Sequence, residues 1–390
     1  MPIKNRFAEM HAEATAWRHD FHRNPELLYD LPRTSGRVAE LLREFGCDEL
    51  VEGIGRTGVV GVIEGQGARQ GGLRCVGLRA DMDALPIREK TGAEHASEVE
   101  GKMHACGHDG HTSTLLAAAK YLCETRAFAG RAVVIFQPAE EGGAGAKAMI
   151  EDGLMERFGI EEVYALHNMP GMEAGSFGIR PDAMMAAADF FDIVLTGKGG
   201  HAAKPQEVID PVPISAHLIL ALQSIVSRAT DPLEEIVLSV TTLETDSKAL
   251  NVIGNSVSLG GTVRTMSAET RDLAERRLRE IAQGVAATHE ATAEVDYRRG
   301  YPVTRNDAAA AEVAAQVAEA VAGTCDRNVD PMMGAEDFAY MLEVRPGAYG
   351  FIGNGPSAPL HHAEYDFNDA ILPAGASWFV GMIEARLPAE

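Results

Sequence analysis

The residues best suited to chemistry gather in one short segment, MHACGHDGH at 103–111. Cys106 and His108 stand two positions apart, so in an extended loop both side chains leave the backbone on the same side. A thiolate and an imidazole together suit a borderline metal ion such as zinc, cobalt or manganese. His104 and His111 are weaker candidates, because flanking histidines more often support ligands or lie exposed. The segment predicts a metal site, against the alternative of a surface loop where these residues meet by chance.

Two adjacent carboxylates follow a predicted buried strand, AVVIF at 132–136. Neighbouring side chains at the end of a strand point in different directions. One of Glu140 and Glu141 can therefore bind a metal ion while the other takes a proton from the water that the ion activates. A solvated acidic turn is the commoner fate of such a pair. The glycines that follow do not indicate a phosphate loop, because GAKA at 145–148 lacks the Gly-Lys-Ser/Thr ending.

Further candidate side chains follow predicted strands or lie near the end of the sequence: Asp81, Asp83, His167, His361 and His362. Asp83 could hydrogen-bond a ligand histidine or tune the general base. A lone histidine such as His167 is more often a satisfied core residue than a ligand, and each candidate is weak alone. Together they place a thiolate, imidazoles and carboxylates near the ends of consecutive strands, where open α/β sheets have their sites.

Apolar strands alternate with helices in the first part of the chain. Helical spacing predicts helices over 33–45 and 109–123, the second with Asp109 as its N-cap. Apolar runs predict strands at 58–63, 73–78, 132–136 and 163–167. This alternation predicts an α/β sandwich with a largely parallel sheet.

The order of the predicted strands and helices changes after about residue 185. Strands are predicted at 188–199, 234–244, 256–265 and 291–301, and helices at 211–228 and 268–289. Their order is β-α-β-β-α-β, the split βαβ pattern of a ferredoxin-like unit. We predict that this unit, residues 186–300, is inserted into a discontinuous domain formed by 1–185 and 301–390.

Composition favours an ordinary folded protein. The 390 residues are 46% hydrophobic, which is ample for two domains. Acidic residues outnumber basic ones by 57 to 35 and no Lys/Arg-rich run occurs, which argues against nucleic acid and anionic membranes as partners. The five widely spaced cysteines imply no disulfide framework. The N-terminal segment lacks the apolar core of a signal peptide, and no stretch approaches about 18 uninterrupted apolar residues. We therefore expect a cytoplasmic protein that spans no membrane.

Many ordered motifs resemble those of the M20 family of metallopeptidases, and specifically its amidohydrolase branch. That branch contains hippurate hydrolases, other N-acyl-amino-acid amidohydrolases and the auxin-conjugate hydrolases. The resemblance spans nearly the whole chain. It is carried by WRHDFHRNPEL, LRADMDALPI, MHACGHDGHTSTLL, FQPAEEGGAGAKAMI, ALHNMPG, GKGGHAAKPQ, GTVRT, MGAEDFA and LHHAEYDFND.

The resemblance implies two divalent metal ions per subunit, Mn²⁺ or Zn²⁺ with Co²⁺ or Ni²⁺ as alternatives. It implies Glu140 as the general base, which deprotonates the bridging water and passes the proton to the departing amine. Asp83 resembles the family's supporting carboxylate. The implied metal ligands are Cys106, His108, Glu141, His167 and a C-terminal histidine.

The last ligand of the family stands in a Leu-His-x-Pro block, which aligns with His361. Here Ala363 replaces the proline and His362 follows directly, so both histidines stay open as candidates, with His361 preferred. NVIG at 251–254 is another departure, because relatives usually have proline after Asn-Val-Ile.

The inserted unit resembles the family's lid and dimerisation domain. His201 matches a histidine that reaches an active site, often that of the partner subunit, and stabilises the oxyanion. Asn251 and Arg264 are candidate contacts for the substrate carboxylate, since an arginine fork suits that task. Without the resemblance, His201 would be read as a turn histidine and Arg264 as a solvated strand residue. A homodimer is expected, with a tetramer as the alternative.

The resemblance therefore predicts a hydrolase that cleaves N-acyl amino acids, hippurate-like, N-acetylated or related conjugates, into a carboxylic acid and a free amino acid. A dipeptidase, aminopeptidase or carboxypeptidase of the same family is the main alternative. A catalytically silent binding protein would lack Glu140 or metal ligands, and none is missing. A structural metal or thiol-redox protein is disfavoured, because closed structural sites have no spare carboxylate.

Overall fold

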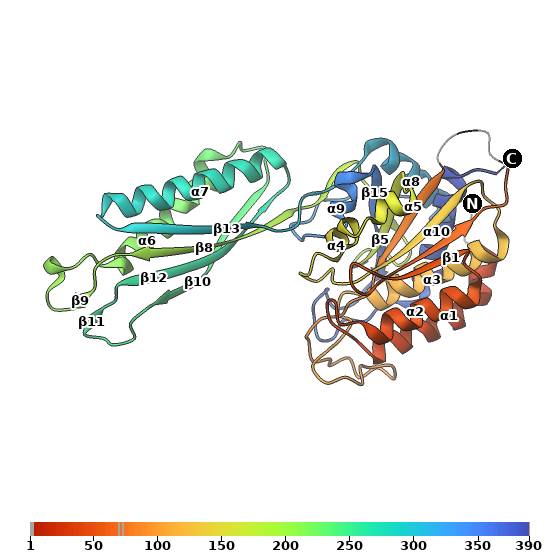
Figure 1. The fold of residues 1–390 in the computed structure, drawn as a ribbon, viewed down its shortest axis with the longest axis horizontal. Helices are drawn as coiled ribbons and strands as arrows, with labels where there is room; N and C mark the ends of the chain where they lie inside the picture. The colour runs from red at the N-terminus through yellow and green to blue at the C-terminus, as the bar shows by residue number, and fades with distance from the viewer. Residues whose placement is uncertain (1–3, 69–70, 72–73, 390) are drawn as a thin grey trace. The chain divides into compact units, whose positions relative to one another are not determined.

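The computed structural model describes residues 4–68, 71 and 74–389. The chain forms two compact units (Figure 1). The first unit comprises Met1–Met184, Arg305–Asp330 and Asp337–Glu390, and the second comprises Met185–Thr304 and Pro331–Glu336. The short strands β7 (Asp182–Met185) and β14 (Thr304–Asn306) lie where the sequence passes from one unit to the other.

A seven-stranded sheet with the order β1-β2-β4-β3-β5-β15-β6 forms the centre of the first unit. Its strands are β1 (Glu49–Ile54), β2 (Gly58–Glu64), β3 (Cys75–Asp81), β4 (Arg131–Gln137), β5 (Glu162–Pro170), β6 (Phe177–Gly178) and β15 (Gly347–Gly355). The four central strands, β4, β3, β5 and β15, are parallel, and the outer pairs are antiparallel. β3 and β15 are buried along their whole length, as expected of parallel strands covered on both faces. The predicted mixed α/β class with a mainly parallel centre is confirmed.

Alternating residues of β3 show how this sheet is covered on both faces. Val76 and Leu78 join the core cluster of the helices α1, α2, α3, α8 and α10. Gly77 faces Ile160 instead, and Arg79 reaches Asp337 just before α9. The helices of the unit are α1 (Asn5–Arg23), α2 (Pro32–Phe45), α3 (His108–Thr125), α4 (Gly145–Glu151), α5 (Leu154–Phe158), α8 (Ala308–Ala322), α9 (Ala339–Val344) and α10 (Leu372–Arg386), with a 3₁₀ turn at Asp369–Ile371.

The start of α3 differs from its prediction. Gly107, with a φ of 89°, occupies the N-cap position, and the helix begins at His108. Asp109 therefore lies inside the first turn and is not the N-cap. Its buried carboxylate accepts a hydrogen bond from His22 Nδ1 at 2.7 Å and pairs with Arg18 Nε at 2.9 Å. These two partners, both on α1, account for the difference.

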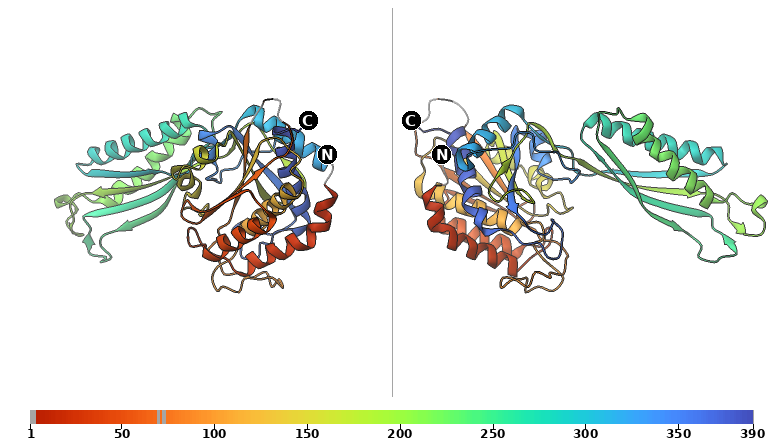
Figure 2. Two further views of the ribbon diagram at one scale, coloured as in Figure 1. Left: turned by 45° about the vertical axis from the view of Figure 1, so that its right-hand side comes forward. Right: turned by 180° about the vertical axis from the view of Figure 1, so that it is seen from behind.

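The second unit is an antiparallel sheet with the order β10-β12-β8-β13. Figure 2 shows α6 and α7 side by side on one face of this sheet. Burial alternates residue by residue along β8, so the opposite face is exposed. The elements are β8 (Ala187–Thr196), β9 (Gly200–His201), a 3₁₀ turn (Pro205–Glu207), α6 (Pro211–Ser224), a π-helical turn (Ile225–Ala229), β10 (Ile236–Thr245), β11 (Val252–Ile253), β12 (Ser256–Thr265), α7 (Ala268–Thr288) and β13 (Thr292–Arg299).

One helical stretch of the second unit, Pro211–Ala229, is long and apolar enough to cross a membrane by length and composition alone. The stretch is not an uninterrupted apolar run, because it includes Ser215, His217 and Gln223. A single such helix is a weak indication of a membrane span, because core helices of soluble proteins pass the same test. Here Ile214, Leu218 and Leu222 pack into the core of the unit, while 28% of the apolar 18-residue window of the stretch is buried.

Candidate metal centre

The loop that precedes α3 brings Cys106 and His108 to the buried end of the helix. Gly107 lies between them, and its positive φ favours glycine. A Cβ at this position would lie 2.2 Å from Nδ2 of Asn168 and 2.5 Å from the hydroxyl of Tyr365, so the packing also excludes a side chain. His167 on β5 joins the pair, because ligand atoms of Cys106, His108 and His167 all lie within 4.8 Å of one another.

A second group shares the thiol of Cys106. Ligand atoms of Cys106, Glu141 and His361 also lie within 4.8 Å of one another. His361 Nε2 is 3.3 Å from Glu141 Oε1, and the backbone N–H of His361 donates to the Ala105 carbonyl at 2.8 Å. His361 has a φ of 61°, which is uncommon for a residue other than glycine and places its side chain where a regular strand would not.

Of the two C-terminal histidines, the structure brings His361 to this group. His362 is exposed, and its Nδ1 accepts a hydrogen bond from the backbone N–H of Glu364 at 3.2 Å. Neither His362 nor His104 belongs to a possible ligand group within the part of the chain that the structure describes. His104 is buried, and burial lowers its pKa to about 3.

The residues present fit divalent cations. Among the described residues, neither Nε2 of His108 nor Oε1 of Glu141 makes a hydrogen bond, although both atoms are buried and lie 4.0 Å apart. Buried polar atoms without partners are rare, and a cation between them would satisfy both. Burial by itself lowers the pKa of His108, but surrounding carboxylates raise it to about 10. The site therefore favours a positive charge at this point. The carboxylates belong to Asp81, Asp83 and Glu141.

His167 is suited to be a neutral ligand. Burial lowers its pKa well below the usual value of histidine. Its Nδ1 donates to the backbone oxygen of Asn168 at 2.7 Å, which leaves Nε2 free of a proton and directed toward Cys106, 3.4 Å from the sulfur. A neutral imidazole with one nitrogen fixed by a backbone carbonyl is a common form of metal-binding histidine.

The side-chain carboxylate of Asp83 holds the backbone of Glu140 and Glu141 in place. Its Oδ1 accepts from the N–H of Glu140 at 2.9 Å, and its Oδ2 accepts from the N–H of Glu141 at 3.1 Å. The backbone oxygen of Asp83 accepts from His108 Nδ1 at 2.7 Å. This bond leaves Nε2 of His108 for a cation. Glu140 is buried beside Glu141 and His108, all within 4.8 Å.

Asp81 and His111 form a third close group with His108. Both are already engaged elsewhere, because Asp81 accepts from Arg79 Nη1 and from His111 Nδ1, each at 2.7 Å. Burial would raise the pKa of Asp81, but the positive groups around it lower that pKa well below its usual value. Because Asp81 is ionised and already accepts two hydrogen bonds, it is a poor candidate for a metal ligand. Asp81 and His111 therefore support the site as hydrogen-bonding neighbours.

Sequence reasoning missed the contribution of the N-terminal helix. Arg18 and His22 of α1 hold Asp109, the residue next to His108. Burial would lower the pKa of His22, but the carboxylate of Asp109 raises it to about 9. This buried ion-pair cluster fixes the first turn of α3 and with it the position of His108.

The candidates of the second unit fall into two places. His201 on β9 is opposite Val252 on β11, and the N–H of Ala202 donates to the oxygen of Asn251 at 3.1 Å, so His201 and Asn251 are neighbours at one end of the sheet (Figure 1). Arg264 stands eight positions along β12 from Ser256, about 26 Å at about 3.3 Å per residue. The structure therefore does not bring Arg264 to the other two within this unit.

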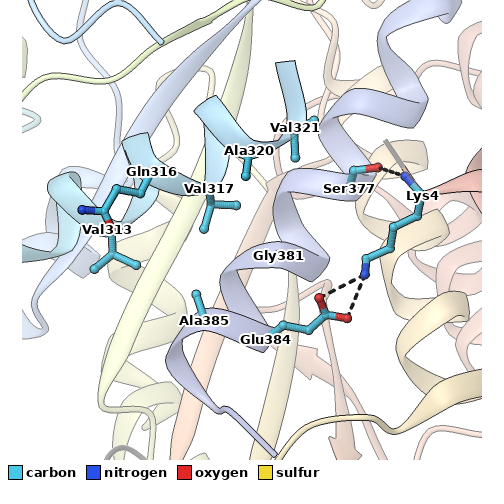
Figure 3. A pocket seen from close by; sticks show the side chains of 10 residues that line it. All are labelled: Lys4, Val313, Gln316, Val317, Ala320, Val321, Ser377, Gly381, Glu384 and Ala385. Atoms are coloured by element: carbon cyan, nitrogen blue, oxygen red, sulfur yellow. Dashed lines mark hydrogen bonds and ion pairs between the residues drawn. The ribbon is translucent and has the colours of Figure 1, made fainter. Parts of the chain in front are cut away.

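A surface pocket of the first unit lies between α8 and α10 (Figure 3). Its walls are mostly small and apolar side chains, among them Val317, Ala320 and Ala385. It contains no histidine or cysteine, and its carboxylate, Glu384, is paired with Lys4 at 2.9 Å. This pocket therefore offers none of the chemistry found around Cys106.

The chain matches the model of peptidase family M20/M25/M40 over residues 77–385. It is 41% identical over 373 residues to hippurate hydrolase of Campylobacter jejuni, covering 95% of this chain and 96% of that protein. It is 37% identical to thermostable carboxypeptidase 2 of Saccharolobus solfataricus, covering 96% and 95%. A solved Bacillus subtilis protein, described as a dinuclear metal-binding peptidase of the M20 family, superposes with a TM-score of 0.86 at 31% identity, covering 98% and 100%.

Proposed function

The chain belongs to peptidase family M20/M25/M40 and is a metal-dependent amidohydrolase, and we propose that its substrates are N-acyl amino acids of the hippurate or N-acetyl type. The observation that carries this proposal is the group of one thiol, three imidazoles and one carboxylate beside a second, buried carboxylate, Glu140; the thiol and two of the imidazoles are buried, and the third, His361, is exposed. The similarity to hippurate hydrolase supports the choice of substrate, and so does a Bacillus subtilis relative, 35% identical over 370 residues, described as N-acetylcysteine deacetylase.

We propose that Cys106, His108, Glu141, His167 and His361 hold two divalent ions, with Cys106 common to both ligand groups. Mn²⁺ and Zn²⁺ are preferred, with Co²⁺ and Ni²⁺ as alternatives, because a thiolate and imidazoles suit such ions. A solved relative described as a dinuclear metal-binding peptidase supports the number of ions. When bound, these ions polarise the acyl oxygen and lower the pKa of the attacking water.

Glu140 performs the proton transfer in the proposed reaction. Its carboxylate removes a proton from the attacking water while the water oxygen bonds to the acyl carbon. The same carboxyl group then gives that proton to the amide nitrogen as the carbon–nitrogen bond breaks, so that a carboxylic acid and an amine are released. Asp83 fixes the backbone of Glu140 and keeps its carboxylate oriented for both transfers. His201 stabilises the oxyanion by donating a hydrogen bond.

Cleavage of peptides is the second candidate activity, and the similarity to a carboxypeptidase supports keeping it. N-acyl amino acids and dipeptides differ in the acyl half of the substrate, which has no α-amine in an N-acyl amino acid and a free α-amine in a dipeptide. Hydrolysis of N-acyl amino acids measured beside dipeptides with the same C-terminal residue separates them.

We propose that the enzyme works as a dimer joined through its second unit. β10 is an edge strand, and such an edge commonly pairs with another chain. The other edge, β13, is protected by charged side chains: Glu294, Asp296, Arg298 and Arg299. Exposed apolar side chains lie on β10, on α6 and on the π-helical turn that follows α6. They are Val212, Leu220, Val226, Val237 and Leu243. A twofold pairing would cover them.

Mixing two inactive variants is expected to restore activity if each site is completed by the partner's His201. In a mixed dimer of Glu140→Ala and His201→Ala chains, one site carries both lesions and the other carries neither. Random exchange of equal amounts should then recover about one quarter of wild-type activity. The measurement is hydrolysis after subunit exchange, with exchange verified by mass-tagged chains. No recovery in verified mixed dimers would contradict a shared site, and each variant mixed with itself is the control.

A further inference from the structure

Three segments far apart in the sequence carry the residues that we propose as metal ligands. They are the loop before α3 with Cys106, the end of β5 with His167, and the segment before α10 with His361. Something must hold these segments at fixed separations, because a cation tolerates errors of only a few tenths of an ångström in its ligand distances. Asn168 contacts all three.

The side chain of Asn168 joins two of the segments directly. Its Nδ2 donates to the backbone oxygen of Cys106 at 2.7 Å. Its Oδ1 accepts from the hydroxyl of Tyr365 at 2.7 Å, and Tyr365 lies four residues after His361. The backbone oxygen of Asn168 accepts from His167 Nδ1, also at 2.7 Å. Both Asn168 and Tyr365 are fully buried, so water does not compete for these bonds.

His111 holds Asn168 from the other side. The ring donates through Nδ1 to the carboxylate of Asp81, which leaves Nε2 to act as an acceptor. It accepts from the backbone N–H of Asn168 at 3.0 Å and lies 3.1 Å from Nδ2 of the same residue. Asp81 is in turn bound by Arg79. The chain of contacts therefore fixes which way each amide and ring points.

The packing at Gly107 shows how closely this arrangement fits the ligand loop. A Cβ on Gly107 would collide with both Asn168 Nδ2 and the Tyr365 hydroxyl. The Asn168–Tyr365 pair thus lies directly against the backbone between Cys106 and His108. A shift of either side chain would move that backbone, and the two proposed ligands with it.

We propose that Asn168, together with Tyr365, is a positioning residue that sets the separation of the Cys106, His167 and His361 segments before a cation binds. The inference rests on the proposed function in one respect, namely that these segments bind divalent ions. Loss of a group that supports a metal ligand in this way typically weakens metal affinity about 10- to 100-fold.

Tyr365→Phe is the sharpest test, because it removes one hydroxyl and keeps the ring. Asn168→Asp is the second variant, since it keeps the shape and replaces the donor to Cys106 by an acceptor. Tyr164→Phe is the matched control: Tyr164 is equally buried in the same unit, and its hydroxyl donates to Glu162 at 2.7 Å, outside the ligand segments. Co²⁺ is titrated into each metal-free protein, and binding is followed by the cobalt–thiolate absorption.

The expected result is a Co²⁺ dissociation constant about 10- to 100-fold weaker in Tyr365→Phe and Asn168→Asp. Tyr164→Phe should match wild type in cobalt affinity, even if its melting temperature falls as much as that of Tyr365→Phe. Unchanged affinity in Tyr365→Phe, or an equal loss in Tyr164→Phe, would overturn the positioning role. If Asn168→Asp does not fold, Tyr365→Phe decides alone. Wild-type protein that binds no Co²⁺ would instead refute the proposed metal centre.

Discussion

Removing divalent metal from the protein is expected to lower the rate of hydrolysis of N-acyl amino acids at least about 1,000-fold. Polarising the acyl oxygen and activating the water together lower the activation free energy by several kcal/mol. Without cations, His108 is left among carboxylates and its raised pKa makes it a cation itself. The residues that remain can position a substrate but supply no Lewis acid. Re-addition of Mn²⁺, Co²⁺ or Zn²⁺ should restore activity.

The measurement is the hydrolysis rate after chelation and removal of the chelator, with elemental analysis of the same sample. Chelator loaded beforehand with the added metal is the control, since it should leave activity intact. Full activity in a sample whose metal content is shown to be negligible would refute the proposed chemistry.

Glu140→Gln is expected to lower kcat about 100- to 10,000-fold, because a positioned general base and acid usually accelerates a reaction by that factor. The amide keeps the shape and the backbone hydrogen bond to Asp83 but can neither take nor return a proton. Because Glu140 is outside the two ligand groups that share Cys106, its loss should leave metal content close to that of wild type.

The matched control is Glu151→Gln, the same chemical change at an exposed position on α4. Its kcat should be that of wild type. A Glu140→Gln enzyme that keeps more than about one tenth of wild-type kcat with normal metal content would exclude Glu140 from the proton transfer.

The sequence predicts much of the first unit because its strands are apolar runs. The predicted strands at 58–63, 132–136 and 163–167 all lie within observed strands, β2, β4 and β5. The helix α1 was not predicted, although Phe7, Met10, Ala14, Trp17 and Phe21 recur at helical spacing and are all buried. In that case the pattern was present in the sequence and could have revealed the helix.

Other parts of the site depend on tertiary contacts that no local pattern contains. Asp109 resembles an N-cap in sequence, but Arg18 and His22 draw its carboxylate away from the helix end. Asn168 meets Cys106 and Tyr365 across 62 and 197 residues of sequence, so its role follows only from the fold. The preference for His361 over His362 likewise depends on a backbone bond to Ala105.

A substrate panel with the metal-reconstituted enzyme decides whether N-acyl amino acids are its substrates. N-benzoylglycine, N-acetyl amino acids and dipeptides of matching C-terminal residues are compared by kcat/KM, with release of acid and amino acid quantified. Glu140→Gln protein prepared in parallel excludes a contaminating hydrolase. We expect hydrolysis of N-acyl amino acids with kcat/KM above that of every dipeptide. Preference for dipeptides, or no cleavage of any N-acyl amino acid by fully metallated enzyme, would contradict it.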